Sequence, residues 1–212
     1  NIAIGNYAAD ALTSGDSNIA IGHNVASNLS SGGANVAIGH DALLATTTQD
    51  NNTAVGYQAL RANTAGNNTA FGKNALVLNT TGTLNVAVGV DALAANTTAD
   101  ANVAVGREAL AANTTGTRNT VVGTSAGVTM STADDNTAVG YVALKDNTAY
   151  RNVAVGSYAL TENTGGANNT AVGHNSLYTQ TTGAQNVAVG TSAGYAITDA
   201  TYNTLVGYQA GV

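Results

Sequence analysis

One motif, Asn-x-Ala-Val/Ile-Gly, recurs along the whole chain of 212 residues, with single substitutions in a few copies. Ten of the twelve spacings between successive copies are 17 residues, and the other two are 16. A fixed period of this length is typical of stacked repeats, in which one unit cannot bury its apolar face alone but neighbouring units can. Thirteen units start at Asn1, Asn18, Asn35, Asn52, Asn68, Asn85, Asn102, Asn119, Asn136, Asn152, Asn169, Asn186 and Asn203.

These units fill residues 1–212 without a linker, so the sequence predicts a single repeat domain. The repeat is in phase at Asn1 and is cut short at Val212, and we therefore expect the chain to be an excerpt of a longer one. Positions within a unit are numbered below from its first Asn.

Each unit opens with a strand-like pattern. Position 4 is large and apolar in every copy, position 2 is Val, Ile or Thr, and position 3 is Ala in eleven copies. Side chains alternate between the two faces of a strand, so positions 2 and 4 share one face and position 3 has the other. We assign position 4, and in part position 2, to the coil interior. The invariant Gly at position 5 predicts a backbone corner.

A second pattern couples positions 9 and 12 in all twelve complete units. Position 12 is polar wherever position 9 is Leu, and it is Leu12, Leu29, Met130 or Ile197 wherever position 9 is Ala or Gly. One apolar side chain therefore fills the same space from either position, which conserves core volume. Residues three apart share a face on a helical turn. The pattern predicts a tight turn, or a single helical turn, over positions 9–12.

One unit then forms one coil of an all-β fold, a parallel β-solenoid or β-roll. Strands stack about 4.8 Å apart, so thirteen coils make a rod of roughly 60 Å. We expect the Asn residues at position 1 of all thirteen units to form a structural ladder, and the Asn-Thr pairs at positions 12 and 13 to form another. In such ladders each side chain bonds its copy one coil along.

Core size favours association of several chains. Each coil buries few large apolar side chains, and the burial of each one stabilises the fold by about 1.5–3 kcal/mol. Ordering the backbone costs about 1–2 kcal/mol of conformational entropy per residue, so a single chain would be only marginally stable. The Ala column at position 3 is assigned to the outside of the coil, yet its residues stay small and apolar. Close packing of three chains about one axis would require such residues. We therefore predict a homotrimer whose seam is Ala3, Ala20, Ala37, Ala54, Ala70, Ala87, Ala104, Ala138, Ala154, Ala171 and Ala188.

The composition argues against several classes of function. Only 8% of residues are charged and the net charge is −6, whereas nucleic acids and anionic membranes require clustered positive charge. No apolar run has the length of a membrane span, and with no cysteine there is no disulfide framework. No catalytic triad, carboxylate pair or phosphate-binding glycine loop is evident. We expect neither an enzyme nor a cofactor.

Few side chains are candidates for a binding site. His23, His40 and Asp41 could together ligate a metal, but position 6 also carries Tyr, Lys, Arg and Ser, so an exposed, variable corner is the favoured interpretation and no metal is predicted. Acidic residues near the unit end skip units, which favours a solvated turn over a calcium site. Candidate glycan contacts are Tyr57, Tyr141, Tyr158 and Tyr208, with surface packing as the alternative.

The units NTAVGYQALRANTAG (52–66) and NVAVGREALAANTTG (102–116) resemble the tandem repeats of phage tail-fibre-like proteins. They are similar, more loosely, to the head repeats of trimeric autotransporter adhesins, although the present unit is longer. The resemblance implies a trimeric fibre or stalk that reaches or adheres to a surface. It also implies an extracellular location, on a virion tail fibre or a bacterial cell surface, and a cell-surface glycan or protein receptor as partner.

Two functional hypotheses follow. The first is a structural fibre or stalk segment of a trimeric tail fibre or surface adhesin. The alternative is a single-chain β-solenoid that binds ice or glycans through its Thr or Tyr columns. An ice lattice requires an unbroken face, and position 14 beside the Thr column is interrupted by Ala65, Ala149, Gly165 and Asp199. The fibre is the favoured hypothesis.

Overall fold

The computed structural model describes all 212 residues as thirteen strands joined by turns, without a helix. Each strand has three residues and covers positions 2–4 of one unit. The strands are β1 (Ile2–Ile4), β2 (Ile19–Ile21), β3 (Val36–Ile38), β4 (Thr53–Val55), β5 (Thr69–Phe71), β6 (Val86–Val88), β7 (Val103–Val105), β8 (Thr120–Val122), β9 (Thr137–Val139), β10 (Val153–Val155), β11 (Thr170–Val172), β12 (Val187–Val189) and β13 (Thr204–Val206).

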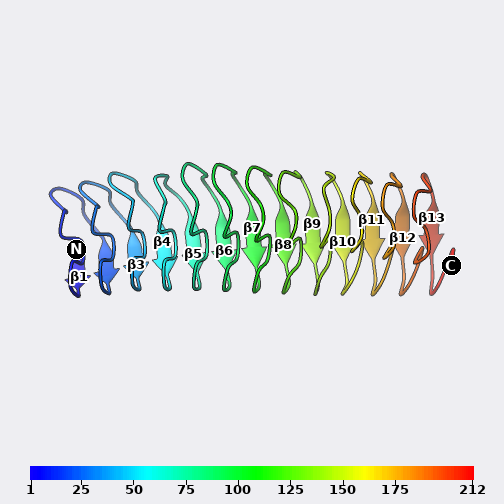
Figure 1. The fold of residues 1–212 in the computed structure, drawn as a ribbon, viewed down its shortest axis with the longest axis horizontal. Coiled ribbons are helices and arrows are strands. Elements are labelled where there is room, and N and C mark those ends of the chain that lie inside the picture. Colours follow the sequence, from blue (N-terminus) through cyan, green and yellow to red (C-terminus); the bar gives the residue numbers. More distant parts are fainter.

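The strands form one parallel sheet in chain order, in which each strand pairs only with the preceding and following coils. Equivalent positions pair along the whole sheet; Ala37, for example, faces Ala54. Figure 1 shows the strands in a row that point the same way, each connected to the next by a loop that returns around the coil. The prediction of an all-β solenoid with one coil per repeat is confirmed.

The corner at position 5 explains the invariant glycine. Gly89 has φ +139°, and a Cβ built on it would lie 2.4 Å from the carbonyl oxygen of Gly106 in the next coil. The same relation holds along the column, because each glycine stacks directly on the next. The coils can approach to hydrogen-bonding distance only where this position has no side chain.

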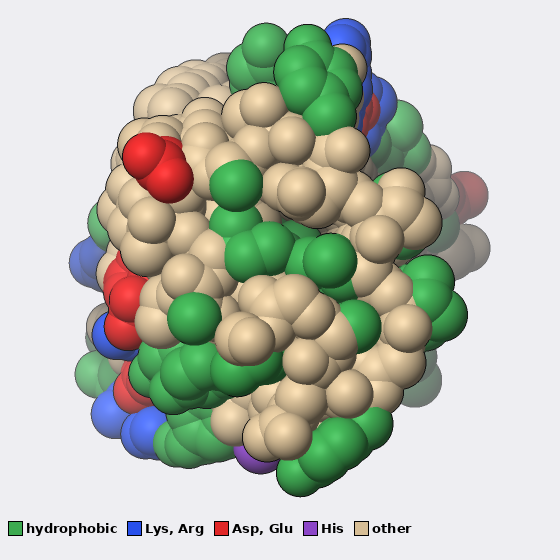
Figure 2. All heavy atoms as spheres, turned by 90° about the vertical axis from the view of Figure 1, so that its right-hand side faces the viewer, with side chains coloured by type: hydrophobic (Ala, Val, Ile, Leu, Met, Phe, Trp, Pro, Cys, Tyr) green, Lys and Arg blue, Asp and Glu red, His purple; other side chains and the backbone are tan.

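The core lies between the strand and the turn that follows it. Ala54 and Ala104 at position 3 are fully buried, as are Leu60 and Leu110 at position 9, and the Ala at position 8 joins them in a continuous cluster of 33 residues. Seen along the rod, apolar side chains occupy the middle of the end face and charged ones are confined to its rim (Figure 2).

The assignment of position 4 to the interior and position 3 to the outside is wrong. Position 3 is buried in every strand from β2 to β12, whereas positions 2 and 4 are half-buried or exposed. The reason is the small cross-section of the coil. A Leu already reaches across from the turn, so the strand facing it has room only for Ala in most coils; a larger side chain there would overpack the interior.

The segment at positions 9–12 is a tight turn, and not a helical one. The backbone N–H of Asn63 donates to the carbonyl of Leu60 at 3.2 Å, but Leu60 has φ +51°, which a right-handed helix excludes. The prediction that one apolar side chain, called the plug below, fills the same space from either position is confirmed. Leu29 and Met130 at position 12 are as fully buried as Leu60 at position 9. A Cβ built on Gly127, at position 9, would lie 2.9 Å from Sδ of Met130.

Candidate functional site

One candidate interaction surface is the outer sheet face, defined as the side chains at positions 2 and 4 of the thirteen strands. These two columns contain only Val, Ile, Phe and Thr, with no charged residue. In mid-rod Phe71 is 55% exposed, and Val139 and Val155 are 38% and 36% exposed. The strip is about 60 Å long, from the usual strand spacing. Position 4 is apolar in all thirteen strands, whereas position 2 is Thr in six of them. Extended exposed apolar patches mark interaction surfaces.

The predicted trimer seam does not lie on this surface. The alanines of strands β2 to β12 point into their own chain and are at most 1% exposed, so they cannot contact a second chain. Only Ala3 is exposed, because the first coil has a neighbour on one side only. The seam prediction failed because strand alternation separates positions 2 and 4 from position 3 without saying which set faces inward.

The asparagines at position 1 lie in one ladder, which is buried from Asn18 to Asn186, exposed at Asn1 and half-buried at Asn203. In each step the backbone N–H donates to Oδ1 of the preceding Asn, as from Asn35 to Asn18 at 2.9 Å. The side-chain Nδ2 closes its own coil by donating to the carbonyl 14 residues later, as from Asn18 to Gly32 at 2.8 Å. The column thus holds each coil closed and holds successive coils together.

The two short coils keep this closing bond by shifting it by one residue. Nδ2 of Asn52 donates to the carbonyl of Ala65, and Nδ2 of Asn136 donates to that of Ala149, both 13 residues later and at 3.0 Å. Ala65 and Ala149 therefore occupy the place that position 15 has elsewhere. The 16-residue units lack the residue at position 14, and their corner is one residue tighter.

A second buried ladder runs along position 12. Nδ2 of Asn79 donates to Oδ1 of Asn63 at 2.7 Å, and Nδ2 of Asn163 donates to Oδ1 of Asn147 at 2.6 Å. Met130 interrupts this column, and Oδ1 of Asn113, one coil before it, is buried without a hydrogen-bond partner. The presence of Met130 in place of a polar residue at position 12 thus leaves an unsatisfied polar atom in the core.

The Thr column at position 13 uses its hydroxyl hydrogens within the rod. Oγ1 of Thr97 donates to the carbonyl of Thr114 at 3.2 Å, and Oγ1 of Thr114 donates to the carbonyl of Ser131 at 3.1 Å. The same contact recurs in most other coils. These hydroxyls therefore act as donors between coils and can offer only acceptor lone pairs to solvent.

The weak metal candidates do not form a ligand cage. His23 and His40 stack with ring centroids 5.1 Å apart, and Nδ1 of His40 lies 3.3 Å from Oδ2 of Asp41. The Asp41 carboxylate accepts hydrogen bonds from Asn24 at 2.7 Å and from Gln58 at 3.5 Å. No group of three or more His, Cys, Asp or Glu side chains converges anywhere in the structure.

The surroundings of Asp41 shift its ionisation. Partial burial raises the pKa of this carboxyl, but the hydrogen bonds from Asn24 and Gln58, with the nearby His40 and Arg61, outweigh burial and lower the pKa below its ordinary value. The carboxylate is therefore a structural acceptor between coils.

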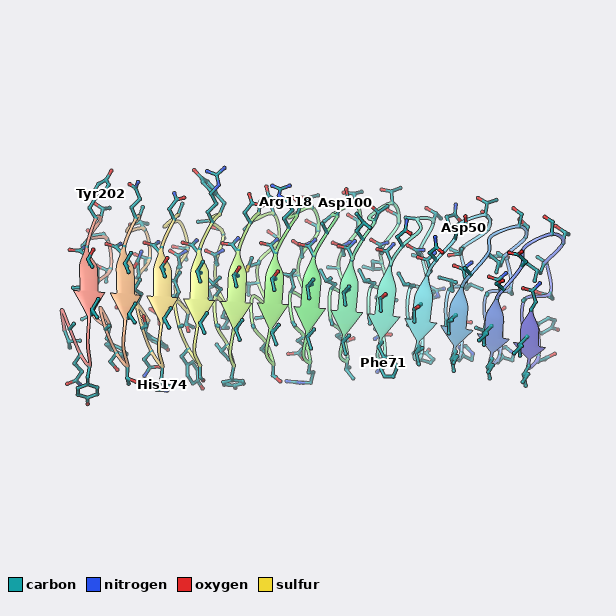
Figure 3. All side chains as sticks on the ribbon, turned by 180° about the vertical axis from the view of Figure 1, so that it is seen from behind. Asp50, Phe71, Asp100, Arg118, His174 and Tyr202 are labelled. Atoms are coloured by element: carbon teal, nitrogen blue, oxygen red, sulfur yellow. The ribbon has the colours of Figure 1, made fainter.

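Acidic residues at the opposite corner, around position 16, serve the same purpose. Oδ1 of Asp100 accepts from the backbone N–H and the hydroxyl of Thr83, one coil earlier, at 2.6 and 2.9 Å. Asp134 makes the same pair of bonds with Thr117. Asp135 forms a two-pronged ion pair with Arg118, at 2.7 and 3.1 Å. Figure 3 places Asp50, Asp100 and Arg118 along this edge.

Of the four candidate glycan tyrosines, only Tyr141 and Tyr158 come together. Tyr57 stacks on His40 at 5.5 Å, and Tyr208 is 74% exposed in the last coil. Tyr141 packs edge-on against Tyr158 at 5.3 Å. Burial raises the pKa of the Tyr158 phenol, and Tyr141 and Tyr178 beside it raise it further.

Around Tyr158 the structure adds aromatic residues that sequence reasoning missed. Tyr178 and Tyr195 occupy position 10 of neighbouring coils and stack at 5.4 Å with an interplanar angle of 8°. Together Tyr158, His174, Asn175, Tyr178 and Tyr195 line a pocket of about 330 Å³, called the tyrosine pocket below. Position 10 is variable in type, and the recurrence of Tyr in two consecutive units was the only available signal.

Comparison of the chain with protein-family models, with curated proteins and with solved structures finds no match. The structure also contains no helix that is long and apolar enough to cross a lipid bilayer. The function is therefore inferred from the surfaces described above.

Proposed function

We propose that the chain is a structural segment of a homotrimeric fibre or stalk, in which three copies pack through the outer sheet face. The observation that carries this proposal is the uncharged strip of Val, Ile, Phe and Thr along all thirteen strands. Leaving such a strip in water forgoes about 25 cal/mol for each square ångström of apolar surface that could be buried. Self-association through this strip would recover that free energy.

The width of the strip supports three copies around one axis. Each strand offers only two outward side chains, at positions 2 and 4, so the face is long and narrow. Two such strips packed face to face would leave their flanks exposed, whereas three around an axis bring each strip against two others. The likeness of the repeat unit to trimeric fibre proteins agrees with this arrangement. Each copy presents the same columns, so the three contacts around the axis are equivalent.

The mechanism of such a segment is geometric. The Asn, Thr and Gly columns tie every coil to the next, so the number of coils sets the length of the rod. We propose an extracellular location on a virion tail fibre or bacterial cell surface, where the rod carries a receptor-binding element toward its target. The Thr column offers little to the ice-binding alternative, because its hydroxyl hydrogens are engaged between coils.

Single cysteines test which face is shared, because the chain contains no cysteine of its own. In the assembled protein, Val105→Cys is expected to be protected from a maleimide and to form interchain disulfides on oxidation. Leu78→Cys is the matched control: Leu78 is 51% exposed at position 11, away from the sheet, and its replacement is expected to be labelled without crosslinking. Labelling of Val105→Cys as fast as the control, with no crosslink, would refute the proposal.

A further inference from the structure

The tyrosine pocket is separate from the outer sheet face. Tyr158 and His174 follow the Gly corner at positions 7 and 6 of adjacent coils, and Tyr178 and Tyr195 lie at position 10, on the turn. In Figure 3 His174 lies at the edge of the rod opposite to Asp50, Asp100 and Tyr202. The pocket residues therefore lie on the corner and the turn, outside positions 2 and 4, which define the outer sheet face.

The rings of this pocket are arranged in two orientations. Tyr178 and Tyr195 stack nearly parallel, whereas Tyr158 stands at 88° to His174 and at 59° to Tyr178, with centroid distances of 6.1 and 6.3 Å. The pocket volume, about 330 Å³, is at the lower end of the range typical of small-molecule sites.

The other aromatic row of the molecule lacks such a pocket. His23, His40 and Tyr57 stack face to face on successive coils, with interplanar angles of 12° and 20°, and Tyr7 stands edge-on to His23 at 87°. No pocket is lined by these four rings. The row on the first coils thus serves as an internal comparison for the pocket on the later ones.

The chemistry of the lining selects the ligand. No Lys, Arg, Asp or Glu lines the pocket, so it holds neither a counter-charge for an anion nor carboxylates for a cation. Three phenol hydroxyls, one imidazole and one carboxamide supply both donors and acceptors around apolar ring faces. A sugar ring in its pyranose form presents the matching combination, an apolar C–H face surrounded by hydroxyl groups.

We propose that the tyrosine pocket binds a neutral hexopyranoside, with its C–H face against the tyrosine rings and its hydroxyls bonded to the phenols, His174 and Asn175. This site goes beyond the structural role proposed above. It gives one side of the rod a weak carbohydrate contact of its own, repeated on each copy in an assembly. Three such contacts held on one rod gain in avidity without any new interaction.

Saturation-transfer NMR with methyl β-D-galactopyranoside, methyl β-D-glucopyranoside and N-acetylglucosamine tests the proposal. We expect transfer to the ring C–H protons of at least one sugar, and a loss of binding of at least tenfold in Tyr178→Ala and in Tyr195→Ala. Tyr195 is 37% exposed, so its replacement leaves the core intact. Tyr57→Ala, in the other aromatic row, is the matched control and is expected to bind like the wild type.

Two results would overturn the proposal. One is the absence of transfer for all three sugars at concentrations up to about 20 mM, at which millimolar affinity is detectable. The other is binding that survives in both Tyr178→Ala and Tyr195→Ala. Either result leaves the fibre proposal untouched, because the assembly is measured through the sheet face and not through this corner.

Discussion

Asn96 donates a hydrogen bond of 2.7 Å from its side-chain Nδ2 to Oδ1 of Asn79, its counterpart one coil earlier, and both side chains are fully buried. Nδ2 of Asn113 donates in turn to Oδ1 of Asn96 at 2.9 Å. The coils are therefore joined through the core by a polar column as well as by backbone pairing. A buried polar column of this kind is sensitive to the loss of any one member.

Replacing a single member of this ladder should destabilise the rod. Asn96→Ala leaves Oδ1 of Asn79 without its donor and leaves Nδ2 of Asn113 with only its bond to the carbonyl of Gly116. We expect a loss of about 1–3 kcal/mol in the free energy of unfolding, the cost of buried unsatisfied groups. Urea unfolding measures it. Asn28→Ala, at an exposed position 11, is the matched control, and an equal effect of both variants would contradict a role for the ladder.

Gly127 and Met130 should behave as a coupled pair. Gly127→Leu alone places Cβ 2.9 Å from Sδ of Met130 and overpacks the core, at a cost of about 1–3 kcal/mol. Met130→Asn alone removes the plug. The double variant Gly127→Leu/Met130→Asn restores the arrangement of the other coils and offers a donor to the orphan Oδ1 of Asn113.

A double-mutant cycle followed by thermal and urea unfolding measures this coupling. We expect the double variant to be at least as stable as the wild type, with a coupling energy of about 0.5–3 kcal/mol in its favour. Simple addition of two destabilising effects would show that the two positions do not share one space.

The glycine column should tolerate no side chain. Gly89→Ala forces a Cβ against the carbonyl of Gly106 and also strains a φ of +139°, so we expect a loss of about 1–3 kcal/mol or more. Gly165→Ala is the matched control, since the nearest atom to its new Cβ is Cγ2 of Thr182 at 3.7 Å. We expect that change to stay within about 0.5 kcal/mol. Similar unfolding midpoints for the two variants would contradict the stacked corner.

The carboxylate of Asp41 should contribute stability that depends on pH. Its pKa is lowered in the folded state, chiefly through the bonds from Asn24 and Gln58 once burial is outweighed. The contribution is therefore present above the ordinary value of 3.8 and is lost as the pH falls through the lower folded value. Wild type should exceed Asp41→Asn in stability at pH 7, and the difference should shrink at pH values below the ordinary one. A difference that is constant with pH would contradict this role.

Sequence reasoning reached the architecture because the repeat encodes it directly. The period defines the coil, the invariant Gly marks the corner and the alternation of Leu60-type and Met130-type plugs reveals the interior space. Each of these signals has one structural meaning in a stacked repeat. The ladders followed from the same logic, since identical residues in register must meet.

The inward face of the strand was not encoded in this way. Hydrophobic size suggested that Val105 should be inside and Ala104 outside, and the structure has the reverse because the Leu plug leaves room only for Ala. The left-handed conformation at position 9 was also unpredictable, because Leu disfavours it and only tertiary packing holds it there. The tyrosine pocket depends on ring orientations across three coils, which a sequence pattern does not carry.

The solution mass of residues 1–212, measured by light scattering after size exclusion, tests the central claim most directly. Self-association through the outer sheet face predicts about three times the chain mass of 20.9 kDa, with Val105→Lys shifting the protein toward single chains. A folded wild type that stays at 20.9 kDa over the whole concentration range would contradict the claim, because the apolar strip would then be stable in water without a partner.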